Sequence, residues 1–154
     1  MFDWILTAVR WLGSLGSKAK RRVKKWAADR QRLVDETADV VTDVKEFIRS
    51  ASPMAATIED VPGAIAARLE ALGTEWSRLR PKLVKRTDRH PSDEVQRLGN
   101  ELAEDVELLL MALRYMGNPL TDPQEKAAAS ESAFERHEHA KTLSADLLER
   151  VRAY

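Results

Sequence analysis

Residues 18–50, KAKRRVKKWAADRQRLVDETADVVTDVKEFIRS, contain neither proline nor glycine and decide the fold class of this chain. A stretch without helix breakers can form one long helix. Steps of alternately four and three residues separate the members of a heptad-like series: Trp26, Arg30, Leu33, Thr37, Val40, Val44, Phe47 and Ala51. This spacing keeps one face of the helix toward a partner. Because Arg30 and Thr37 interrupt the apolar series, we expect a helix packed in a bundle and not a pure coiled coil.

Prolines divide the next part of the chain. Residues 51–62, ASPMAATIEDVP, contain two prolines and predict a connection. Pro62 suits the first turn of the following helix, which we expect to end at Pro81 because proline ends or kinks a helix. The apolar residues of this helix recur at helical spacing: Ile65, Leu69, Leu72, Trp76 and Leu79. A polar loop, residues 85–92 (KRTDRHPS), should follow it.

Two more helices are predicted after that loop. The first starts near Pro91, ends at a capping Gly117, and has this apolar series: Val95, Leu98, Leu102, Val106, Leu109, Leu113 and Met116. The second has the clearest start signal in the chain, residues 122–125 (DPQE), with a capping acid, a proline at the first helical position and a glutamate at the third. It should continue to Arg152 and bury four apolar side chains: Phe134, Leu147, Leu148 and Val151.

The sequence also predicts how particular apolar residues pack. Residues 106–116 are apolar on every side of the predicted helix, and such a helix must be covered on every side. It therefore lies in the middle of the bundle, or one of its faces contacts another copy. Trp26 and Trp76 are expected to anchor the core. Residues 127–129 are all alanine, which permits close helix approach and suggests a self-association face.

Composition agrees with a helical protein. The chain has 154 residues, 44% hydrophobic and 32% charged, and only six glycines and six prolines, too few for the many turns of a β-rich protein. We predict an all-α protein, an elongated four- to five-helix bundle. Residues 1–25 should form an amphipathic helix plus a polybasic segment, and residues 26–154 a helical bundle domain. There is no cysteine, which excludes disulfides, thiol catalysis, zinc–cysteine sites and iron–sulfur clusters.

Charge is distributed unevenly along a chain whose formal net charge is zero. Residues 1–31 hold eight basic residues against two acidic ones, a formal charge of +6, so the remainder carries −6. A basic head on an acidic body favours binding of the head to an anionic surface, or self-association in which each head meets a neighbouring body.

The first residues predict an amphipathic helix. At 100° per residue a narrow polar stripe collects Asp3, Thr7, Arg10, Ser14 and Ser17, and apolar side chains fill the rest of the circumference. A wide apolar face containing tryptophan is typical of helices that lie at a lipid interface. The segment from Phe2 to Leu15 is only about 21 Å long as a helix, too short to cross a bilayer.

Six lysines and arginines follow within residues 18–25. Near an anionic surface each contributes about 1 kcal/mol, so the basic run and the apolar helix together could hold the protein on a membrane. The predicted membrane- or partner-binding residues are Phe2, Trp4, Ile5, Val9, Trp11, Leu12, Leu15, Lys18, Lys20, Arg21, Arg22, Lys24 and Lys25.

This pattern leaves the target of the N-terminal segment open. The first hypothesis is a non-enzymatic protein that docks on an anionic membrane and self-assembles or binds a partner through its helical body. The alternative is a structural subunit of a large assembly, of virion or shell type, whose N-terminal helix packs against other subunits. Contact of the basic run with nucleic acid ranks third, because no aromatic residue except Trp26 interleaves with the basic ones.

Location is predicted from the same segment. Basic residues follow the apolar stretch instead of preceding it, so no secretory signal is expected, and no apolar run reaches the about eighteen residues of a membrane-spanning helix. We expect a cytoplasmic protein, either peripheral to a membrane or within an assembly.

Candidate catalytic groups are weak. Glu101 and Glu104 have the spacing of paired metal-binding acids, but helical periodicity turns Glu104 away from the core stripe. His137 and His139 lie on different faces of a helix, so we place them at the surface, with His137 partly buried beside Phe134. No nucleophile constellation and no phosphate-cradling glycine loop occurs in the sequence. We therefore predict no catalytic residues, no metal site and no cofactor.

Overall fold

The computed structural model describes residues 7, 10, 16–56 and 63–154. Four long helices make up this part of the chain: α2 (Ser17–Ser50), α4 (Ala64–Asp88), α5 (Asp93–Gly117) and α6 (Pro123–Ala153). A single turn, α3 (Pro53–Ala56), follows α2. No strand occurs in the described ranges, so the all-α prediction is confirmed, with four long helices as the number. The predicted N-terminal amphipathic helix lies outside the described residues, apart from Thr7 and Arg10.

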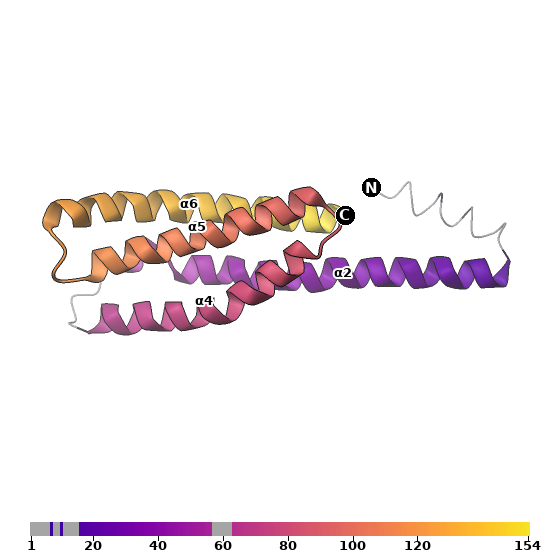
Figure 1. Cartoon of the computed structure of the whole chain (residues 1–154), viewed down its shortest axis with the longest axis horizontal. Helices are drawn as coiled ribbons and strands as arrows, with labels where there is room; N and C mark the ends of the chain where they lie inside the picture. The colour runs from indigo at the N-terminus through magenta and orange to yellow at the C-terminus, as the bar shows by residue number, and fades with distance from the viewer. Residues whose placement is uncertain (1–6, 8–9, 11–15, 57–62) are drawn as a thin grey trace.

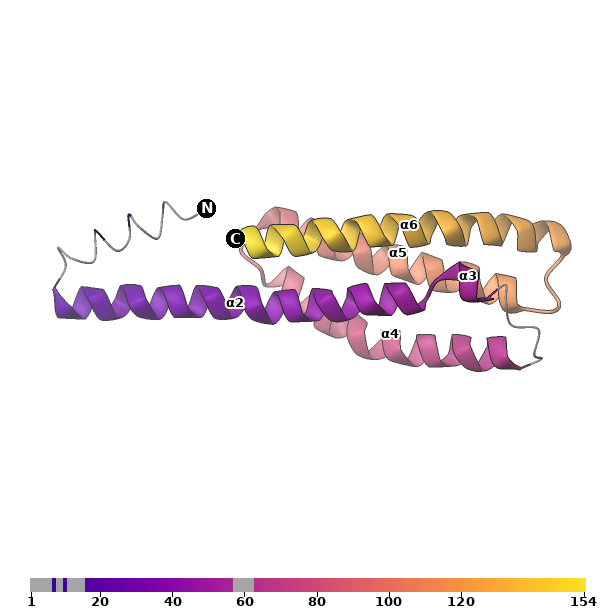
Figure 2. The ribbon, with the colours of Figure 1, turned by 180° about the vertical axis from the view of Figure 1, so that it is seen from behind.

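The long helices pack side by side, each antiparallel to the next along the chain (Figures 1 and 2). Contacts join α2 to α4, α4 to α5, α5 to α6, and α6 back to α2, so the four helices form a closed bundle. Short connections between consecutive helices favour this antiparallel arrangement. The predicted domain boundary at residue 25 falls within α2.

The core confirms most of the predicted apolar series. Thr37, Val44, Phe47 and Ala51 of the heptad-like series are buried, and Trp76 stacks on Phe47 with ring centroids 5.5 Å apart. The predicted start of the last helix is also confirmed, since the Asp122 carboxylate accepts a hydrogen bond from the Gln124 N–H at 3.3 Å.

The predicted end of the second helix at Pro81 is wrong. α4 continues through this proline to Asp88, so the predicted loop begins only after that residue. Proline removes one backbone hydrogen bond, but Leu79 before it and Leu83 and Thr87 beyond it recur every four residues and are buried. Burial of this face offsets the lost hydrogen bond. Figure 1 shows a change of direction along α4, as is usual for a helix that contains a proline.

Gly117 does not act as the predicted capping residue. It is the last residue of α5, and Asn118 takes the cap position. A Cβ atom on Gly117 would lie 2.8 Å from Leu69 Cδ1 and 2.9 Å from Ile65 Cγ2. The glycine therefore permits close approach of α4 to the end of α5. Its role is this helix contact and not the capping that the sequence predicted.

Two further expectations of burial are wrong, those for Trp26 and Phe134. Trp26 is 54% exposed, because it lies on a part of α2 that extends beyond α4, α5 and α6, and Phe134 is 37% exposed. Met111 and Tyr115 are more than half exposed, so one chain does not cover α5 on every side. Of the two alternatives for residues 106–116, a contact with another copy stays a prediction. An apolar residue is buried only where another helix faces it, and local sequence does not state where that is.

Candidate docking surface

The first part of α2 projects beyond the other three helices (Figures 1 and 2). We call residues 17–29 the basic arm, and their length at the helical rise is about 20 Å. No residue of the arm is buried, and the first buried residue of α2 is Thr37. The arm is helical because residues 17–29 contain no helix breaker, although none of the other long helices that the structure describes, α4, α5 and α6, covers it.

Six cations surround the arm. Successive residues of a helix turn by 100°, so closely spaced cations point in different directions. Five of these side chains are exposed and Lys20 is half-buried, and none makes an ion pair with another described residue: Lys18, Lys20, Arg21, Arg22, Lys24 and Lys25. Their charges are therefore available to an external anionic surface. The apolar members of the predicted site lie outside the described residues: Phe2, Trp4, Ile5, Val9, Trp11, Leu12 and Leu15.

The arm is attached to the bundle through Arg30. One guanidinium nitrogen of Arg30 donates a hydrogen bond to the backbone carbonyl of Tyr154, just past the end of α6. The guanidinium carbon also lies 4.5 Å from the centre of the Tyr154 ring and 5.4 Å from the centre of the Trp26 ring. Both distances fit cation–π contacts. Arg30 thus links the base of the arm to α6.

Beneath Tyr154 lies the buried ring of His90, with ring centroids 4.7 Å apart at 68°. The His90 Nδ1 accepts a hydrogen bond from the Ser92 N–H at 3.1 Å, which places the ring proton on Nε2 in the neutral form. Desolvation lowers the pKa of His90 below its ordinary value, so the ring stays neutral at pH 7. The Arg30–Tyr154–His90 stack joins α2, the end of α6 and the α4–α5 loop.

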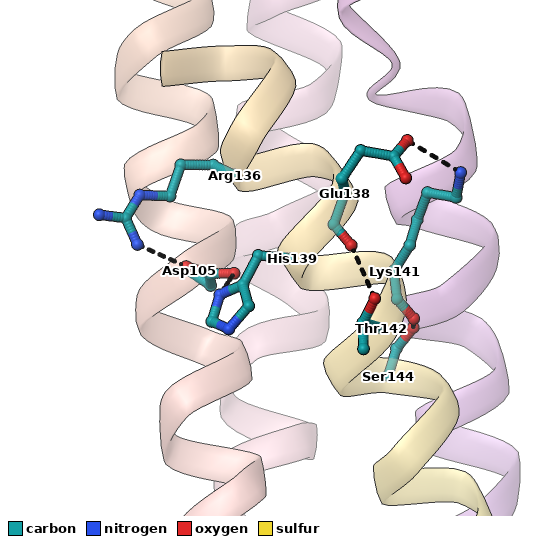
Figure 3. Close-up of polar contacts among 7 residues, drawn as sticks. All are labelled: Asp105, Arg136, Glu138, His139, Lys141, Thr142 and Ser144. Carbon is teal, nitrogen blue, oxygen red and sulfur yellow. Dashed lines mark hydrogen bonds and ion pairs between the residues drawn. The ribbon is translucent and has the colours of Figure 1, made fainter. Parts of the chain in front are cut away.

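Sequence analysis missed one buried charge, that of Asp105. Its side chain is about 4% exposed and accepts hydrogen bonds from Arg136 Nη1 at 2.9 Å and His139 Nδ1 at 2.6 Å (Figure 3). Asp105 is three residues from Leu102 and four from Leu109, so helical spacing does place it on the core side of α5. The exposed acids Glu104 and Glu107 lie close to Asp105 in the sequence, so composition alone does not single it out. The cluster clamps α5 to α6.

Glu101 and Glu104, whose spacing resembles a metal-binding pair, have separate surroundings. Glu101 forms an i,i+4 ion pair with Arg97 at 2.6 Å, and Glu104 is exposed. Across residues 7, 10, 16–56 and 63–154, no group of three or more acidic, histidine or cysteine side chains has the geometry of a metal site. His137 is more buried than predicted, and its Nε2–H donates to the Ile48 carbonyl at 2.9 Å.

Comparisons with known proteins found no matching family model, no similar curated protein and no similar solved structure. Among the helices that the structure describes, none is long and apolar enough to cross a bilayer.

Proposed function

We propose that this protein binds an anionic membrane surface through residues 2–25, and that it is a non-enzymatic protein whose helical body self-assembles or binds a partner. The observation that supports this proposal is the basic arm, a helix outside the bundle with six cations and no ion pair to another described residue. The arm extends about 20 Å beyond α4, α5 and α6 and contributes no buried residue to the core, so packing of the core does not account for it.

Electrostatics gives the arm its affinity. Each lysine or arginine near an anionic leaflet contributes about 1 kcal/mol, so the six together contribute several, and the contribution weakens at high salt. The apolar residues that precede the arm in the sequence supply burial into the interface. Because the remainder of the chain carries a formal charge of −6, the membrane attracts the arm and repels the body, which orients the molecule.

Sedimentation with vesicles tests this proposal. Full-length protein should pellet with phosphatidylserine-containing vesicles at low ionic strength, and should stay in the supernatant with pure phosphatidylcholine. An arm-neutralised variant should lose most of this binding: Lys18→Gln, Arg21→Gln, Arg22→Gln and Lys25→Gln.

A matched control neutralises four exposed cations of α4 and the loop after it: Arg78→Gln, Lys82→Gln, Lys85→Gln and Arg89→Gln. This control should pellet like the wild type, because it changes net charge equally without touching the arm. Equal supernatant fractions for the wild type and the arm-neutralised variant would contradict the proposal. Equal losses in both variants would reduce it to a non-specific effect of net charge.

The exposed Trp26 favours the second candidate, a structural subunit of a large assembly whose N-terminal helix packs against other subunits or whose basic run contacts nucleic acid. Trp26 continues the apolar series of α2 beyond the bundle, and its ring is 54% exposed. On this hypothesis purified protein forms a defined particle in light scattering, Trp26→Ala disrupts that particle, and vesicles bind neither form. Vesicle binding by a monomer would exclude it.

A further inference from the structure

A cavity of about 430 Å³ lies between α2 and α6, away from the basic arm. Small-molecule sites in proteins commonly have about 300–1,000 Å³. Polar side chains from both helices, and one from the segment just after α2, line the cavity: Lys45, Arg49, Ser52, His137, Lys141 and Ser144. Figure 3 shows Lys141 and Ser144 on the side of α6 opposite Arg136 and His139. The cavity is therefore separate from the Asp105 cluster.

The lining of this cavity is basic. Lys45 and Arg49 are four residues apart on α2, so they lie on the same flank of the helix, and Lys141 faces them from α6. Among the residues that the structure describes, no carboxylate lines the cavity. Lys141 pairs with the exposed Glu138 at 3.1 Å, whereas Lys45 and Arg49 make no ion pair within the described ranges. Three cations around one hollow repel each other, and an anion between them removes that repulsion.

The end of α2 could have opposed an anion, because a helix C-terminus carries partial negative charge. Two carbonyls in its last turn, and one just beyond it, are already bound by side chains. The Ile48 carbonyl accepts from His137 Nε2 at 2.9 Å, and the Ser50 and Ser52 carbonyls accept from Arg68 at 2.8 and 3.0 Å. These donors, which include the charged Arg68, compensate the negative end of the helix and leave the cations dominant in the cavity.

Two serines add neutral groups to the wall. The Ser144 hydroxyl is about 1% exposed and donates to the Lys141 carbonyl at 2.9 Å, which fixes its oxygen in the wall. Ser52 contributes a second hydroxyl at the α2 side. Charged groups that converge on a partly buried site with hydroxyls nearby are the usual donors to phosphoryl oxygens.

A neighbouring hollow of about 370 Å³ shares Lys45 and Ala145 with the cavity and adds Arg152 and Glu149. The cavity and this hollow together have room for more than one oxyanion. By contrast, a hollow of about 580 Å³ on α4 is lined by that helix alone, with two glutamates and one arginine, and lacks a second wall. The α2–α6 cavity is the better ligand site because two elements enclose it.

We propose that the α2–α6 cavity binds a phosphoryl oxyanion, carried by a soluble phosphate ester or by a lipid headgroup. Lys45, Arg49 and Lys141 supply the charge, and Ser52 supplies a hydroxyl donor. This site does not depend on residues 2–25, so it stands apart from the proposed membrane docking.

Isothermal titration of full-length protein with pyrophosphate at low ionic strength tests the site. Wild type should bind pyrophosphate. The variant Lys45→Gln with Arg49→Gln should bind it at least about tenfold more weakly, since two charge-assisted donors are lost. A matched control, Lys82→Gln with Lys85→Gln, should change affinity by less than about twofold because these lysines lie on α4. Lys141→Gln, on the other wall, should weaken binding independently.

The proposal is overturned if wild type does not bind pyrophosphate, or if the control pair loses as much affinity as the cavity pair. Phosphatidic acid vesicles, added as competitors to the arm-neutralised variant, distinguish the two sources. Competition supports a lipid headgroup in the cavity, and binding of pyrophosphate without competition supports a soluble phosphate ester. Because the titration itself contains no vesicles, its failure leaves the membrane proposal unaffected.

Discussion

Replacing Gly99 with alanine should destabilise the bundle, although alanine is the better helix former. The added Cβ would lie 2.4 Å from the Cβ of Thr87 and 2.3 Å from its Oγ1. Real Cβ atoms do not approach so closely, and the position of a Cβ is set by the backbone, so no rotamer change relieves the contact. α4 and α5 must move apart.

The expected magnitude combines two opposing effects. Overpacking a close contact costs about 1–3 kcal/mol or somewhat more, and replacing glycine inside a helix returns up to about 1 kcal/mol. Because the clash involves Cβ atoms on both helices, we expect the upper part of this range and a net loss of about 2–3 kcal/mol. For a chain of this size that corresponds to a fall in Tm of roughly 4–12 °C.

Gly73 provides a matched control in α4. A Cβ there would lie 3.2 Å from Arg114 Nη2, the far end of a flexible, exposed side chain that can move away. Gly73→Ala should therefore stabilise the protein by about 0.5–1 kcal/mol. The two substitutions add the same methyl group to a helix interior and differ only in what that group meets.

Urea and thermal unfolding followed by circular dichroism measure both variants against wild type. Changes of Tm in opposite directions support the close approach of α4 to α5 at Gly99. Adding Thr87→Ala to Gly99→Ala should recover little stability, because the Thr87 Cβ remains in the contact. A Tm for Gly99→Ala at or above that of wild type would refute the reasoning.

The remaining predictions concern buried polar groups. Because burial lowers the pKa of His90 in the folded state, its contribution to stability is present above pH about 6.5 and is lost as pH falls through the lower folded value. Protonation would also break the bond from the Ser92 N–H, so the fall in urea-unfolding free energy from pH 7.5 to 5.5 should be smaller in His90→Gln than in wild type; an equal fall contradicts this. Asp105→Asn should cost about 1–3 kcal/mol, because the charge that binds Arg136 at 2.9 Å is removed from a buried position. Glu101→Gln, which alters an exposed ion pair, is its control and should cost less than about 0.5 kcal/mol in the same assay; equal costs would show that burial of Asp105 is unimportant.

Helix limits were predictable where local chemistry decides them. The absence of breakers from residues 18–50 predicted one helix, and α2 spans Ser17–Ser50. The start of α6 was predictable because Asp122 and Pro123 satisfy the first turn by themselves. Pro81 shows the limit of this reasoning, since the local penalty of a proline was smaller than the gain from burying the residues beyond it.

The candidate sites were predictable only in part. The six cations of residues 18–25 are evident in the sequence, but their position on an arm outside the bundle is not, because it depends on where α4 and α6 end. The α2–α6 cavity left no local signal at all. Lys45 and Lys141 are ordinary surface lysines in their own helices, and only packing of those helices brings them together.

The sequence by itself determined that the described part of the chain is helical, that a basic run follows an apolar-rich segment, and which residues could face a core. Periodicity and helix breakers act within a few residues, so they can be interpreted without a fold. Only the tertiary structure decided that Trp26 is exposed, that Gly99 and Gly117 permit close helix contacts, and that Asp105 is buried between two helices. Burial and close approach depend on the surface of the neighbouring helix, and residues distant in sequence supply that surface.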